Sequence, residues 1–122
     1  MWVSSKAIKK LKKSIRELSG REANVSVSFE WDANKDGINQ QKHGISFDSA
    51  CYVFEDLFAI IEYDEKHSVC EDRFCIIGKV FSFFVFVIFT VRQDHIRIIS
   101  ARLATRGEVK RYFDRNKDCC WR

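Results

Sequence analysis

The chain has 122 residues and contains no proline and only five glycines, so its composition provides no flexible linker between domains. Its five cysteines form no Cys-x-x-Cys pair and no Cys/His cluster with the spacing of a zinc site. We therefore expect one cytoplasmic domain with reduced thiols, and no disulfide framework, metal or other cofactor. The strongly charged N-terminal residues do not match a signal peptide.

The sequence also lacks a hydrophobic stretch long enough for a membrane helix. Its most apolar run, residues 75–91, is interrupted by polar residues and falls short of the roughly 20 apolar residues that such a helix needs. Phe, Val and Ile dominate this run, and they favour β-strands that are buried on both faces. We therefore expect strands here and no association with a membrane.

What is present is a globular composition with unevenly placed charge. Hydrophobic residues make up 46% and charged residues 31% of the chain, which argues against a disordered protein. Seven basic and two acidic residues give residues 1–24 a net charge of +5. Residues 25–91 carry −6 (five basic, eleven acidic) and residues 92–122 carry +5 (nine basic, four acidic). Either basic end can therefore meet a polyanion.

Hydrophobic periodicity predicts an α+β protein. The expected helices cover residues 4–19, 33–43, 47–54 and 106–116, and the expected strands cover residues 25–31, 57–63, 73–80, 83–91 and 96–101. Beyond the first helix, the order is β-α-α-β-β-β-β-α. Four consecutive strands with short connections predict an antiparallel sheet, in a two-layer fold with the helices on one side.

Three segments are expected along the chain: a basic helical extension at residues 1–24, a domain at residues 25–116 and a tail at residues 117–122. The helix at residues 4–19 has a stripe of apolar residues surrounded by lysines. It can dock this stripe on the domain, or serve as a basic arm for RNA or a partner. An isolated helix of this length is only marginally stable in water, so it needs a surface to pack on.

Two stretches of sequence carry a resemblance to a known family. The first is Phe29-Glu30-Trp31-Asp32, then Lys35, Asn39 and Lys42-His43-Gly44-Ile45-Ser46-Phe47. The second is Arg97-Ile98-Ile99-Ser100-Ala101-Arg102, then Ala104-Thr105-Arg106, Glu108 and Tyr112. Between them, His67-Ser68, Glu71, Arg73-Phe74 and Gly78 follow in matching order. Over about residues 28–114, the chain resembles the BrnT family of toxins.

The resemblance implies a RelE-like ribonuclease fold and the toxin of a bacterial type II toxin-antitoxin system. Such a toxin is a metal-independent endoribonuclease that cleaves RNA and so inhibits translation and growth. The implied partners are RNA and a BrnA-like antitoxin, with DNA reached only indirectly through the antitoxin, in a homodimer or a toxin-antitoxin hetero-oligomer. Residues 1–24, the apolar turn at residues 79–83 and the tail at residues 119–122 depart from the family pattern. The apolar turn predicts poor solubility or a surface that a partner covers.

Metal-free RNA cleavage needs a base for the 2′-hydroxyl proton, a cation for the phosphorane and an acid for the leaving 5′-oxygen. Arginine suits the second role, and the resemblance assigns catalytic or phosphate-binding roles to Arg73, Arg97 and Arg102, with Ser100 as a further catalytic candidate. Strict alternation would place Arg97 and Arg102 on opposite faces of their strand, so we expect a bulge or a strand end near Ala101. Alternatively, these arginines are exposed strand residues paired with Glu or Asp.

Proton transfer points to His67, because an imidazole exchanges protons near neutral pH, with Glu71 as its orienting group or as the base. The alternative for His67 is an ordinary loop histidine on the surface. The candidate RNA-binding residues are Arg106, Lys35, Lys42 and His43, although His43 also suits the C-terminal end of its helix.

For the other motif residues we predict only a position in the fold. Tyr112 and Trp31 are expected in the core, whereas Lys35 and Asn39 are expected on the outer face of their helix. Two further functions stay open beside the endoribonuclease. One is a non-catalytic module that binds RNA, DNA or an antitoxin through the same arginines, and the other is a degenerate family member.

Overall fold

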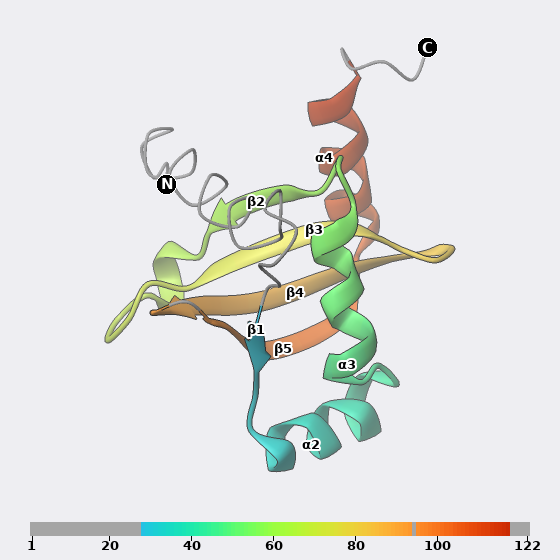
Figure 1. Ribbon diagram of the computed structural model, residues 1–122. Coiled ribbons are helices and arrows are strands. Elements are labelled where there is room, and N and C mark those ends of the chain that lie inside the picture. Colours follow the sequence, from blue (N-terminus) through green and yellow to red (C-terminus); the bar gives the residue numbers. More distant parts are fainter. Residues whose placement is uncertain (1–27, 94, 118–122) are drawn as a thin grey trace, which may run out of the picture.

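The computed structural model describes residues 28–93 and 95–117. A five-stranded sheet with the order β1-β5-β4-β3-β2 forms its centre (Figure 1). The strands are β1 (Ser28–Glu30), β2 (Ile60–Tyr63), β3 (Phe74–Val80), β4 (Phe83–Arg92) and β5 (His95–Leu103). The helices are α2 (Ala33–His43), α3 (Phe47–Ala50) and α4 (Arg106–Asn116), with 3-10 turns η1 (Cys51–Glu55) and η2 (Glu65–His67). The expected helix at residues 4–19 and the tail at residues 117–122 lie outside the described residues, apart from Lys117.

Helix-capping residues explain why the bounds of α2 and α4 match the prediction. The side chain of Asp32 accepts hydrogen bonds from two backbone N–H groups of the first turn of α2, and Gly44 ends the helix with φ of 72°. Thr105 and Glu108 form a capping box at the start of α4. The predicted helix at residues 47–54 is shorter than expected, because the chain tightens into η1 after Ala50.

The sheet is mixed, which corrects the prediction of an antiparallel sheet. β2, β3, β4 and β5 form the expected antiparallel meander. β1, however, does not join β2, the next strand in the chain. It pairs in parallel with β5, so β1 and β2 lie at opposite edges of the sheet. The pairing runs from Ser28–His95 to Glu30–Arg97, so it covers only the first part of β5.

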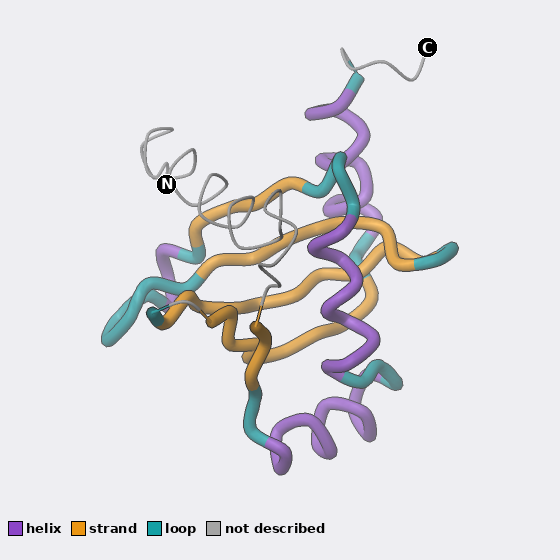
Figure 2. The backbone as a smooth tube through the Cα atoms, in the orientation of Figure 1, coloured by secondary structure: helices purple, strands orange, loops and turns teal. Residues whose placement is uncertain are grey.

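The helices lie on both faces of the sheet, which corrects the prediction that they occupy one side. α3 and η1 cover one face (Figure 2), where the larger core cluster includes Phe47, Val53, Ile76, Val87, Phe89 and Ile98. α4 packs on the other face, where Tyr112 joins Ile60 and Ile77. The neighbours Ile76 and Ile77 thus enter different clusters, because side chains alternate along a strand. The continuous apolar run of β3 and β4 already indicated burial on both faces. We call the second surface the α4 face.

Helix α2 lies beside the free edge of β5, and one buried amide ties the two together. Asn39 is 5% exposed, so the prediction that it lies on the outer face is wrong. Its Nδ2 donates to the carbonyls of Ala101 (2.7 Å) and Ile45 (3.0 Å), and the N–H of Ala101 donates to its Oδ1 (3.2 Å). β1 does not extend to this part of β5, so Asn39 satisfies backbone groups that no strand among the described residues reaches.

Two of the core predictions hold, and the β3–β4 turn is as apolar as expected. Tyr112 is 3% exposed, and Trp31 packs edge-on against Phe47 at the margin of the core. Phe81 (φ 56°), in the turn, and Phe83, at the start of β4, keep 78% and 59% of their surfaces exposed. No helix within residues 28–93 and 95–117 is long and apolar enough to cross a membrane.

Candidate functional site

A bulge in β5 brings Arg97, Ser100 and Arg102 to the same face of the sheet. The ladder between β4 and β5 shifts register, which leaves Ile99 without a partner. Because this extra residue shifts the alternation of side chains by one position, Arg97 lies on the same face as Ser100 and Arg102. The prediction of a bulge near Ala101 is therefore confirmed, and the shared surface is the α4 face.

Arg73 lies near Arg97 at the end of the sheet where β3 begins. Thr90 stands between them, because it pairs with Arg97 and its hydroxyl donates to the carbonyl of Asp72 (2.6 Å). Two strand spacings correspond to about 10 Å between the backbones that carry the two arginines. Arg102 lies five residues farther along β5, about 15 Å away by the rise of a strand. The predicted arginines therefore spread across the sheet and along β5 rather than forming one cluster, and we call the three of them the arginine row.

His67 belongs to η2, in the loop at the same end of the sheet, and its partner is Asp64. Its Nδ1 lies 3.0 and 3.1 Å from the two carboxylate oxygens of Asp64. The histidine side chain is 57% exposed and the aspartate 17% exposed. With Nδ1 facing the carboxylate, Nε2 is directed away from it, which is the arrangement of an oriented acid–base group.

The prediction that Glu71 orients His67 is wrong. Glu71 instead forms an ion pair with Arg92 on β4, at 3.0 Å. Asp64 is the residue that sequence reasoning missed, although its place three residues before His67 is the spacing at which side chains meet across one helical turn. The loop is tied to β3 through Ser68, whose Oγ donates to the carbonyl of Asp64 (2.6 Å) and accepts from the N–H of Arg73 (2.9 Å).

Arg97 and Arg102 both pair with carboxylates, as the alternative interpretation expected, but in different ways. Arg97 Nη1 donates one hydrogen bond to Glu30 Oε2 (2.8 Å), and the two side chains are 27% and 37% exposed. Arg102 donates from both terminal nitrogens to Glu108, each at 2.8 Å, and the carboxylate is only 10% exposed. The guanidinium of Arg102 also lies over the ring of Phe86, 4.1 Å from the ring centre.

Charge and hydrogen bonds reinforce each other around Glu108. Burial opposes its charge, but hydrogen bonds from Arg102 and from Thr105 outweigh this effect and hold the pKa of the Glu108 carboxyl below its usual value. The hydrogen bond to Glu108 in turn raises the pKa of the Arg102 guanidinium. The pair is therefore fully ionised at neutral pH. Elsewhere on this face, burial raises the pKa of the Cys75 thiol to about 12, so it is no thiolate nucleophile at neutral pH.

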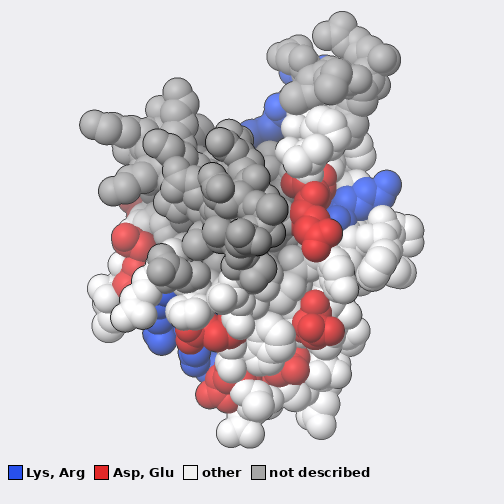
Figure 3. All heavy atoms as spheres, viewed as in Figure 1, with Lys and Arg blue, Asp and Glu red and all other residues white. Residues whose placement is uncertain are grey.

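The candidate RNA-binding residues do not gather in one place. Arg106 is exposed at the start of α4, whereas Lys35, Lys42 and His43 are exposed on α2, beside the free edge of β5. On the side that α3 covers, described Asp and Glu side chains spread over the surface and Lys and Arg lie mostly at its margins (Figure 3). The arginine row is therefore the feature of the structure that best matches a polyanion.

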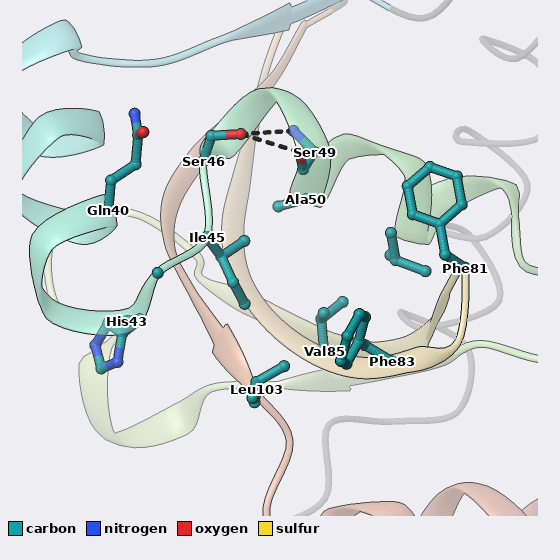
Figure 4. A pocket seen from close by; sticks show the side chains of 12 residues that line it. Gln40, His43, Ile45, Ser46, Ser49, Ala50, Phe81, Phe83, Val85 and Leu103 are labelled. Carbon is teal, nitrogen blue, oxygen red and sulfur yellow. Dashed lines mark hydrogen bonds between the residues drawn. The ribbon is translucent and has the colours of Figure 1, made fainter.

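A groove of about 440 Å³ lies away from this row, between the start of α3 and the β3–β4 hairpin (Figure 4). Its lining is mainly apolar and includes Ile45, Phe81, Phe83 and Leu103, with His43 at one end. It holds no pair of groups suited to proton transfer among the described residues. Within the same part of the chain, no three His, Cys, Asp or Glu side chains are placed to hold a metal ion.

Comparison with known proteins identifies the family. Residues 31–108 match the family described as "Ribonuclease toxin, BrnT, of type II toxin-antitoxin system". No curated protein matches the chain significantly. The matched residues span α2 to the first turn of α4, well over half of the chain, and include the arginine row with Asp64 and His67. The chain therefore belongs to the BrnT family of ribonuclease toxins.

Proposed function

We propose that this protein is a metal-independent endoribonuclease toxin that cleaves RNA on the α4 face, at the end of the sheet that carries His67. The observation that carries the proposal is the His67–Asp64 pair next to Arg73, with Arg97 two strands farther across the same end of the sheet. It supplies an oriented acid–base group and cations for a phosphate, two of the three groups that the reaction requires without a metal.

In the proposed reaction, Nε2 of His67 accepts the proton of a ribose 2′-hydroxyl while Asp64 holds the ring through Nδ1. The 2′-oxygen attacks phosphorus and the bond to the 5′-oxygen breaks, leaving a 2′,3′-cyclic phosphate. Arg97, with Arg73 on the neighbouring strand, stabilises the extra negative charge of the phosphorane. The leaving 5′-oxygen takes its proton from solvent.

The same proposal covers the cellular role. We propose a RelE-like toxin domain at residues 25–116, with residues 1–24 as an extension, that inhibits translation and growth in the cytoplasm. A BrnA-like antitoxin would neutralise it in a toxin-antitoxin complex and would make the contact with DNA. The family match supports the toxin and the existence of an antitoxin partner, and the finer statements are ours.

The test is cleavage of single-stranded RNA by the purified chain in the presence of EDTA. We expect 2′,3′-cyclic phosphate ends, and a loss of about 10²- to 10⁴-fold for His67→Ala, the range of general acid–base catalysis. Arg97→Ala should also lose activity, whereas Lys110→Ala, which removes an exposed cation paired with Asp114 on α4, is the matched control. Intact RNA, or equal rates for His67→Ala and the parent chain, would contradict the proposal and favour a module that only binds RNA or an antitoxin.

A further inference from the structure

Arg102 differs from a phosphate-binding arginine because its terminal N–H groups already donate hydrogen bonds within the protein. Both of its terminal nitrogens donate to Glu108 at 2.8 Å, and one also donates to the carbonyl of Leu103 at 3.1 Å. A phosphate that bound along this terminal edge would have to displace the carboxylate, so only the Nε side of the guanidinium is left to receive one. Glu108 cannot move away easily, because it also accepts the N–H of Thr105 at 2.8 Å in the capping box.

The two flat faces of the guanidinium are not equivalent. The inner face lies on the ring of Phe86, with 4.1 Å between the guanidinium carbon and the ring centre. The Arg102 side chain is nevertheless 33% exposed, although its edge is engaged by Glu108. A planar cation over an aromatic ring, with its terminal edge engaged and part of its side chain exposed, is the type of platform on which nucleobases stack.

We infer that Arg102 and Phe86 form a nucleobase-stacking site, in which an unpaired base of RNA lies on the outer face of the Arg102 guanidinium. This inference rests on the proposed function, because it places part of the same substrate. Glu108 neutralises the charge of Arg102 and repels an incoming phosphate, so the site selects the neutral base over the backbone. Glu108 is thus a positioning residue for Arg102.

The place of the platform on the sheet gives it a role distinct from that of Arg97. Arg102 lies about 15 Å along β5 from Arg97, by the rise of a strand. The strand of RNA would therefore run along β5, with its scissile phosphate at the His67 end and a base away from the cut on Arg102. Ser100 and Ile88, half-buried partners in the ladder, lie between the two positions. Stacking tolerates all four bases, so the platform would hold the strand in register without reading its sequence.

The experiment measures binding of a short single-stranded 2′-O-methyl oligonucleotide, which cannot be cleaved through its 2′-oxygen. One series replaces each nucleotide in turn by an abasic one, and a second varies the salt concentration. For the parent chain, one abasic position should weaken binding by roughly 5- to 150-fold, the range of a lost stacking contact. Arg102→Lys should weaken binding of the intact oligonucleotide by a similar factor and abolish the effect of that abasic position, with the same salt dependence as the parent.

Arg106→Ala is the matched control, because it removes an exposed cation at the start of α4 and leaves the platform in place. It should lower the slope of log K against log salt by about 0.7 and keep the abasic effect. Phe86→Leu removes the ring beneath the guanidinium and should reduce the abasic effect too. Urea midpoints within the range of the parent would show that the variants are folded.

An abasic effect of equal size in the parent chain and in both platform variants would overturn the inference. So would a lower salt slope for Arg102→Lys, because that would make Arg102 a phosphate contact. Cleavage of ordinary RNA by the parent chain, measured in parallel, separates this failure from a failure of the proposed function. Binding with an abasic effect but without cleavage would support the platform and contradict the ribonuclease.

Discussion

Replacement of Asn39 by alanine tests how α2 holds the strand that carries the arginines. Asn39 makes three hydrogen bonds, two of them to the N–H and carbonyl of Ala101, and both partners are buried. The alanine variant leaves these two backbone groups of β5 without a partner. A buried polar group that loses its partner costs about 1–3 kcal/mol, while alanine favours the helix by roughly 0.5 kcal/mol. We therefore expect a loss of about 2–4 kcal/mol, a large part of the 5–15 kcal/mol typical of a domain.

Urea denaturation of the full chain measures this loss as a lower midpoint with an unchanged m value. Gln41→Ala, an exposed amide on the same helix, is the control and should stay within about 0.5 kcal/mol of the parent. RNA cleavage under native conditions should also fall, because Ala101 lies between Ser100 and Arg102. A loss below about 0.5 kcal/mol for Asn39→Ala, or one equal to that of the control, would refute the reasoning.

Two further predictions concern the α4 face and the packing behind it. Because the pKa of Glu108 is lower in the folded chain than the unperturbed value of about 4.3, its stabilisation is present above that pH and is lost as the pH falls through the folded pKa. Urea midpoints of the parent should therefore fall more steeply below pH 4.5 than those of Glu108→Gln, and parallel curves would contradict this. A Cβ on Gly78 would lie 2.8 Å from Val53 and 3.0 Å from Ala59, so Gly78→Ala should lower the free energy of unfolding by about 1–3 kcal/mol in the same assay. An unchanged urea midpoint would contradict this, because it would mean that η1 moves aside at no cost in stability.

Local sequence signals predicted the helices α2 and α4 well, because their ends are fixed by residues next to them. Asp32 and Gly44 mark the two ends of α2, and Thr105 caps the start of α4, in each case through contacts within a few residues. The β5 bulge was also predictable, since the arginines of a single strand could share a face only with an extra residue between them. The strand order was not predictable in this way, because the parallel pairing of β1 with β5 depends on residues about 67 positions apart.

The errors at the site have the same physical origin. Asn39 is buried while its apolar neighbour Ile38 is 59% exposed, the reverse of what hydrophobicity indicates. The cause is a backbone edge that lies 62 residues farther along the chain and that an amide can satisfy. The prediction that Glu71 orients His67 failed because Arg92, on another strand, pairs with Glu71 and because Asp64 lies within reach of His67. A sequence presents the candidate carboxylates, but tertiary partners decide which one is available.

The same reasoning distinguishes the two ion pairs of β5 and gives a last prediction, for Glu30→Gln. Glu30 makes a single hydrogen bond to Arg97 and is 37% exposed, and such a pair is worth only about 0–1 kcal/mol. A phosphate can therefore take its place, and removing the competing charge should tighten binding of the uncleavable oligonucleotide by about two- to fivefold at low salt. Asp48→Asn, an exposed carboxylate on α3, makes the same change in net charge far from the arginine row. Tighter binding for both variants alike would mean that net charge, and not the release of Arg97, governs the affinity for RNA.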